Sequence, residues 1–249
     1  MRRVALFLLG LLLSVSPSLR AADGTDPAIP RAKAHVELGL AYLQGGRMAV
    51  ALDEATSAMA ADPNYAPAYN LAGMVNMFLR ETDKAREYFE HALKLDPNDS
   101  EINVNYGWLL CQSGHEKDSF QYFIKAVKNP LYQTPTKAFF NAGICALKLD
   151  DQARAEDYFV NSIMADRNNT QALFRLADIK YRGNNLYDAK RFVNAVLAKV
   201  QDDPAPLWLA LRIERKLGNR QAEQDYALEL RRKFQGSPEY QAMIQGRFE

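Results

Sequence analysis

The feature that most constrains this chain is a pair of small residues that recurs at a nearly constant interval. In each pair, a glycine or alanine is followed twelve positions later by a second small residue. The pairs are Gly39/Ala51, Gly73/Ala85, Gly107/Ser119, Gly143/Ala155, Ala177/Ala189 and Ala210/Ala222. Their second members are spaced 34, 34, 36, 34 and 33 residues apart. A period of this length predicts a chain built from stacked copies of one supersecondary unit.

The residues around each pair indicate that the unit is two antiparallel helices. Four units carry an aromatic residue four positions after the second small residue, at Phe89, Phe123, Phe159 and Tyr226. We expect the small residues to let the two helices approach closely and the aromatic to fill the gap to the next unit. Asp62-Pro63 and Asp96-Pro97 close the first two units, because proline cannot continue a helix.

This is the pattern of the tetratricopeptide repeat. It predicts an all-α fold, a right-handed superhelix of about six tetratricopeptide (TPR) helix-turn-helix repeats. An ordinary helical bundle would not explain the fixed period. The 36-residue step falls at residues 129–135, which contain two prolines, so we expect a longer connection there.

The first residues predict export. Arg2 and Arg3 precede an apolar run at residues 4–15, and Ala21 provides a small residue for cleavage. The run is too short for a membrane-spanning helix, although an uncleaved N-terminal anchor is the alternative. No cysteine follows the run, so we expect no lipoprotein anchor.

Without residues 1–21 the net charge falls from +1 to −2, which gives no reason to expect a nucleic-acid partner.

These features give the predicted domain organisation. We expect a signal peptide at residues 1–21, a linker at 22–31, the TPR superhelix at 32–240 and a C-terminal tail at 241–249. The units start near residues 32, 66, 100, 136, 170 and 204. The second helix of the last unit is rich in charged residues, as expected for a terminal repeat whose outer face meets water.

The first helices of TPR units line a concave surface, which is where such proteins bind partners. The predicted groove residues are Val36, Leu40, Leu43, Asn70, Met74, Met77, Phe78, Trp108, Phe140, Ile144, Phe174 and Tyr181. This largely apolar set favours a groove for an amphipathic helix or a hydrophobic peptide. The alternative is that several of these side chains pack within the superhelix itself. TPR domains that clamp a C-terminal carboxylate place Lys and Asn at groove positions, and these positions are mostly apolar here.

Cys111 and Cys145 are the only cysteines, and they fall on the first helices of neighbouring repeats. In an oxidising compartment they can form a disulfide if their Cα atoms come within about 7 Å. The alternative is two buried, reduced thiols.

No pattern in the chain indicates catalysis or a bound cofactor. His35, His91 and His115 lie in different repeats, without a second ligand at metal spacing. There is no phosphate-binding glycine loop and no nucleophile elbow. We therefore expect a protein-binding scaffold rather than an enzyme, with no cofactor, metal or small-molecule substrate.

Several strings are more specific than the repeat itself. They are NYGWLLC at 105–111, NPLY at 129–132, NAGICA at 141–146, APLWL at 205–209 and FQGSPE at 234–239. Together they resemble the type IV pilus biogenesis and stability proteins of the PilW/PilF class, and the resemblance covers about residues 32–240.

That resemblance implies a non-enzymatic role in the periplasm, near the outer membrane. The implied partners are the secretin or other type IV pilus assembly components. It also favours the disulfide, since both cysteine positions of the class match Cys111 and Cys145. Proteins of this class are commonly lipoproteins, which this sequence does not predict for itself. A general periplasmic TPR adaptor for another envelope machine is the alternative function.

Overall fold

The computed structural model describes residues 28–248, and within that range every regular element is a helix. The helices are α1 (Ala28–Gln44), α2 (Met48–Ala61), α3 (Ala66–Phe78), α4 (Thr82–Leu95), α5 (Ser100–Gln112), α6 (Glu116–Val127), α7 (Pro135–Lys148), α8 (Gln152–Ala165), α9 (Thr170–Arg182), α10 (Leu186–Leu197), α11 (Pro204–Leu217), α12 (Arg220–Lys233) and α13 (Pro238–Ile244).

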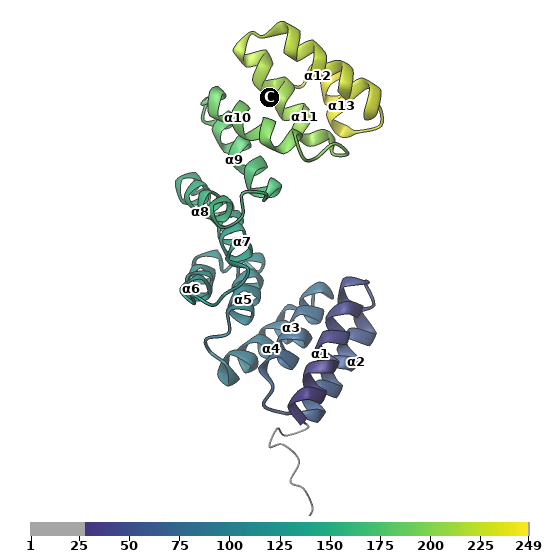
Figure 1. Ribbon diagram of the computed structural model, residues 1–249, viewed down its shortest axis with the longest axis vertical. Coiled ribbons are helices and arrows are strands. Elements are labelled where there is room, and N and C mark those ends of the chain that lie inside the picture. Colours follow the sequence, from purple (N-terminus) through teal and green to yellow (C-terminus); the bar gives the residue numbers. More distant parts are fainter. Residues whose placement is uncertain (1–27, 249) are drawn as a thin grey trace, which may run out of the picture.

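Helices α1 to α12 form six consecutive pairs, in which each helix packs most extensively on its partner. The pairs stack into an elongated arc (Figure 1), with α5 and α7 on its inner side and α6 and α8 on its outer side. The short α13 packs against α11 and α12 and covers the last pair. This arrangement confirms the predicted all-α TPR superhelix.

The helix boundaries differ from the sequence prediction at both ends. Helix α1 begins at Ala28, so the last four residues of the predicted linker are helical. Helix α13 runs from Pro238 to Ile244 and so crosses the predicted start of the tail. The predicted signal peptide lies outside the described residues. As expected, the connection between α6 and α7 is longer than the one between α4 and α5.

Side-chain caps fix where many of the helices begin. The carboxylate of Asp99 accepts the backbone N–H of Ile102 at 2.8 Å, and Asn169 accepts that of Ala172 in the same way. Further caps of this kind stand at Asp151, Asn185, Asp203, Asn219 and Ser237. Each satisfies a backbone donor that the first turn of a helix leaves free, so short polar residues between repeats set the helix starts.

In each of three central helix pairs, a glycine on the first helix contacts the ring of a phenylalanine on the second. A Cβ at Gly73 would lie 2.8 Å from the Phe89 ring, and one at Gly143 would lie 2.6 Å from the Phe159 ring. The same contact joins Gly107 to Phe123. All three rings are almost completely buried. The absence of a side chain on the first helix is therefore what admits the ring of the second.

These contacts correct one detail of the sequence analysis. The aromatic residues were expected to fill the gap to the next unit, but each ring lies first on the glycine of its own unit. The Phe89 ring also reaches the next unit, since its centroid lies 6.2 Å from that of Tyr106. The Phe89 ring therefore packs within its own helix pair and also against the next pair.

We predict that Gly143→Ala lowers the free energy of unfolding by about 1–3 kcal/mol, because the new methyl group would overlap the fully buried Phe159 ring and force it to shift within the core. Urea unfolding followed by circular dichroism measures this difference.

Gly45→Ala is the matched control. A Cβ there would meet its nearest atoms only at ordinary contact distance, 3.5 Å or more. Its stability should stay the same or rise slightly. Equal losses in the two variants would contradict the proposed role of the glycine–phenylalanine contact.

Candidate partner-binding surface

The predicted groove residues all lie on the odd-numbered helices α1 to α9, which form the inner side of the arc. The backbones of α1 and α3, of α3 and α5, and of α5 and α7 approach closely. Within residues 28–248 the even-numbered helices stay further apart and meet through long side chains, as Phe120 on α6 and Tyr158 on α8 do. A stack whose first helices touch and whose second helices spread apart must curve toward the first helices. The inner face of the arc is therefore built by α1, α3, α5, α7 and α9.

Nine of the twelve predicted groove residues retain accessible surface. Phe78 is the most exposed of them, with 58% of its surface accessible. The partly buried members are Leu40, Asn70, Met74, Met77, Trp108, Phe140, Ile144 and Phe174. Apart from Asn70, these side chains are apolar, and they form a surface that packs on the core.

The other three, Val36, Leu43 and Tyr181, are buried. Val36 packs with Ala58 and Ala68, and Leu43 packs in the cluster that contains Leu71. Their apolar character serves contacts between helices, which is the alternative that the sequence left open. The surface available to a partner is thus narrower at repeat one than predicted.

The accessible apolar residues recur along the inner helices from repeat one to repeat five. Met74 contacts both the core of repeats one and two and the cluster around Phe89, which Met77 also contacts. Trp108, Phe140 and Ile144 pack on a single core cluster that spans repeats three to five. Phe140 also lines a hollow of about 840 Å³, together with Tyr132 and Lys137. A bound segment could follow this series across several repeats.

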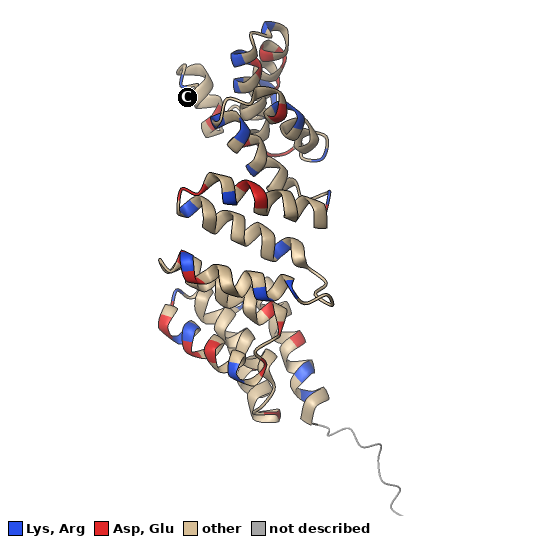
Figure 2. Cartoon of the chain, turned by 90° about the vertical axis from the view of Figure 1, so that its left-hand side faces the viewer, with Lys and Arg blue, Asp and Glu red and all other residues tan. Residues whose placement is uncertain are grey.

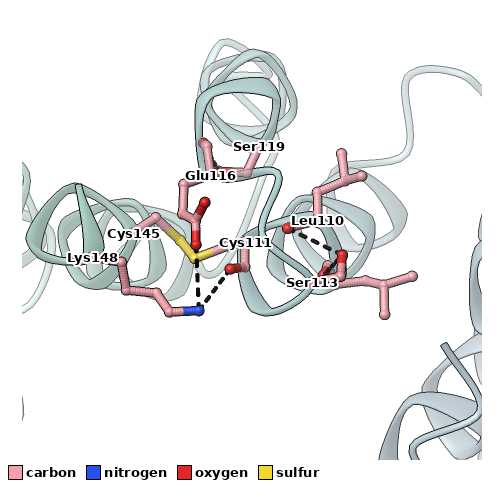
Figure 3. Close-up of a disulfide and its surroundings, with 8 residues drawn as sticks. Leu110, Cys111, Ser113, Glu116, Ser119, Cys145 and Lys148 are labelled. Atoms are coloured by element: carbon pink, nitrogen blue, oxygen red, sulfur yellow. Dashed lines mark hydrogen bonds and ion pairs between the residues drawn. A yellow bond between two sulfur atoms is a disulfide. The ribbon is translucent and has the colours of Figure 1, made fainter.

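A disulfide joins two of the helices that carry this surface. Cys111 on α5 and Cys145 on α7 are bonded, with their Cα atoms 5.8 Å apart. Figure 3 shows Lys148 beside the bond. Its ammonium donates to the carbonyl oxygen of Cys111 at 2.8 Å and pairs with Glu116 at 3.6 Å. Covalent and polar links therefore hold repeats three and four together next to Trp108 and Ile144.

A row of polar side chains lies beside these apolar residues, and the sequence analysis predicted only one of its members, Asn70. The Asn105 amide donates to the side-chain oxygen of Asn70 at 3.0 Å, and Lys137 donates to the side-chain oxygen of Asn105, also at 3.0 Å. Lys137 also pairs with Glu101 at 2.7 Å. Glu101 and Lys137 both stand second in their units, so their places in the repeat could have indicated that they face the groove.

The Glu101–Lys137 pair sets the ionisation of this row. Burial by itself would raise the pKa of the Glu101 carboxyl, but the hydrogen bond and positive charge of Lys137 together bring that pKa below its ordinary value. Glu101 is therefore ionised at neutral pH. It gives the apolar surface an edge with one negative and one positive group.

On the side shown in Figure 2, Lys and Arg alternate with Asp and Glu, and neither sign forms a continuous face. In residues 28–248 no helix is long and apolar enough to cross a membrane, and no three His, Cys, Asp or Glu side chains group as they would to hold a metal ion.

The fold and the repeats place this chain among the tetratricopeptide repeat proteins. Family models of the tetratricopeptide repeat match residues 18–66, 66–99 and 88–121. The type IV pilus assembly protein PilF of Pseudomonas aeruginosa is 28% identical over 223 residues, which cover 90% of this chain and 87% of PilF.

Two solved structures show more specifically which tetratricopeptide repeat proteins this chain resembles. A structure of Pseudomonas aeruginosa PilF is 26% identical, with a TM-score of 0.79, and the match covers 88% of this chain and 99% of that one. A structure of PilW, a widely conserved type IV pilus biogenesis factor, is 31% identical, with a TM-score of 0.76, and the match covers 86% and 98%. The chain belongs to the PilF/PilW family of type IV pilus TPR proteins.

We predict that reduction of the Cys111–Cys145 bond lowers the free energy of unfolding by about 3–4 kcal/mol, because the bond closes a long loop in the unfolded chain. Urea unfolding with and without reductant measures the effect.

The double variant Cys111→Ala, Cys145→Ala is the control, and its unfolding should not respond to reductant. Identical curves for the wild type with and without reductant would contradict a stabilising bridge. So would free thiols that titrate in denatured, unreduced wild-type protein.

Proposed function

We propose that this chain is a non-enzymatic periplasmic scaffold for type IV pilus biogenesis. In this proposal the inner face of repeats one to three holds a segment of the secretin or of another pilus assembly protein. The leader at residues 1–21 would direct the chain to the periplasm, near the outer membrane. Membership of the PilF/PilW family supports the pilus role, and the inner surface supports the mode of binding.

One observation carries the binding proposal. Phe78 is 58% exposed at the end of α3, beside the partly accessible Met77 and the exposed Leu79. Exposed apolar side chains that adjoin one another on a face already lined by apolar residues are costly in water unless a partner covers them. Methionine is unbranched and flexible, so Met74 and Met77 can adapt to the shape of a bound segment.

The partner most compatible with this surface is an amphipathic helix or an extended apolar segment. The accessible residues are apolar along the middle of the inner face, whereas Glu101 and Lys137 give charges of both signs beside it. A bound segment would place apolar side chains on Met77 and Trp108 and polar groups toward that pair. This chemistry needs no reacting group, which agrees with a scaffold.

A photo-crosslinking residue placed at Phe78 tests the proposal in cells. We expect it to capture a type IV pilus assembly component, with the secretin as the first candidate to probe. The matched control places the same residue at Tyr187, which is 80% exposed on α10, an outer helix.

Capture of the pilus component from Phe78 but not from Tyr187 would support the inner-face site. Capture of the same protein from both positions would contradict that site. Capture of only a component of another envelope machine would contradict the pilus role and favour the general adaptor.

A further inference from the structure

The chain after α13 returns to the inner face of the molecule at repeats five and six. Gly246 has a φ of +69°, in the left-handed region that favours glycine, and this turn ends the helix. The backbone N–H of Arg247 then donates to the carbonyl oxygen of Ala242 at 2.9 Å. As a result Phe248 lies against side chains from α9 and α11.

Phe248 is held through both its ring and its backbone. Its ring centroid lies 5.3 Å from that of Trp208, and the guanidinium carbon of Arg215 lies 3.9 Å from the ring centre. Its carbonyl oxygen accepts a hydrogen bond from Arg212 at 3.3 Å and one from the Tyr181 hydroxyl at 3.4 Å. The tail thus binds here through an aromatic ring and a backbone carbonyl, two groups that a peptide segment of another protein also carries.

This contact completes the burial of the predicted groove residue Tyr181, which also packs in a core cluster with Leu209 and Ile213. The guanidinium carbon of Arg212 lies 4.5 Å from the centre of the Tyr181 ring, and the ammonium of Lys216 lies 4.1 Å from it. With Phe248 at its hydroxyl end, the ring is covered by two cations and the tail. At repeat five, the chain's own tail therefore covers the inner face.

The space beside the tail is positively charged. A pocket of about 860 Å³ is lined by Tyr181, Arg182, Arg212, Arg215, Lys216, Gly246 and Phe248, a set with four cations and no carboxylate. Arg182 pairs with Asp178, and Arg215 pairs with Glu223. Within the described residues, Arg212 and Lys216 have no ion-pair partner. The pocket therefore has two cations available to an anionic group.

We propose that the position of the Phe248 ring against Trp208 and Arg215, together with the pocket beside it at Tyr181, Arg212 and Lys216, is a second peptide-binding site. Its ligand is a partner-protein segment that carries an aromatic residue next to a carboxylate. The aromatic side chain takes the place of Phe248 between Trp208 and Arg215, and the carboxylate meets Arg212 and Lys216. The chain's own tail occupies the site until such a segment displaces it. This site is separate from the inner face of repeats one to three, so either can fail without the other.

The tail has the chemistry that the proposal assigns to the ligand. In the sequence, the acidic residue Glu249 directly follows Phe248. A peptide with the sequence of residues 244–249 is therefore the natural probe. Because the tail competes with the probe at high effective concentration, wild-type protein should bind it weakly.

The test uses full chains and a fluorescently labelled peptide of residues 244–249. We expect Phe248→Ala to bind the peptide at least tenfold more tightly than the wild type, because the substitution empties the position of the ring between Trp208 and Arg215. Adding Lys216→Gln to Phe248→Ala should reduce the affinity again, about tenfold. A probe with alanine in place of its phenylalanine should not bind.

Arg220→Gln in the Phe248→Ala background is the matched control. Arg220 is exposed at the start of α12 and lies outside the pocket, so its removal should leave the affinity unchanged. Circular dichroism establishes that each variant is folded.

Two results would overturn the proposal. In one, folded Phe248→Ala binds the probe no more tightly than the wild type, which would make the tail a structural cap only. In the other, Lys216→Gln and Arg220→Gln reduce binding equally, which would indicate nonspecific attraction to positive charge.

Discussion

The rest of the structure depends on the close approach of two helices at a glycine. Where Gly73, Gly107 and Gly143 lie, the ring of a phenylalanine on the second helix rests on the backbone of the first. That contact sets the distance between the helices of a pair, and the Phe89 ring also contacts Tyr106 of the next pair. Because the same contact recurs in three successive pairs, these pairs stack in sequence as part of the arc (Figure 1) rather than as a bundle.

The arc determines what the molecule can offer to partners. First helices that touch along the inner side bring Met74, Met77, Trp108, Phe140 and Ile144 onto one face. The longer connection before α7 would allow repeats three and four to shift, but the disulfide and Lys148 join them at this point. The inner face therefore has adaptable side chains on a restrained backbone. At repeats five and six the tail covers the equivalent face.

The sequence predicted the period, the six pairs and the helices that line the inner face, because these follow from local residue patterns. It did not predict that Phe248 covers Tyr181, since Phe248 lies 67 residues further along the chain. The row from Asn70 through Asn105 to Lys137 depends on the rotation between successive repeats, which spacing alone does not define. The early start of α1 at Ala28 was missed, because residues 28–31 precede the first small pair and lie outside the repeated pattern.

The central claim is that the inner face serves pilus biogenesis, and surface piliation tests it most directly. Cells that lack the gene would be complemented with the wild type, with Phe78→Glu on the inner face, or with Tyr187→Glu on the outer face. Pili would then be counted by electron microscopy at matched protein levels. The account predicts that Tyr187→Glu restores pili and that Phe78→Glu does not. Full piliation with Phe78→Glu would contradict it.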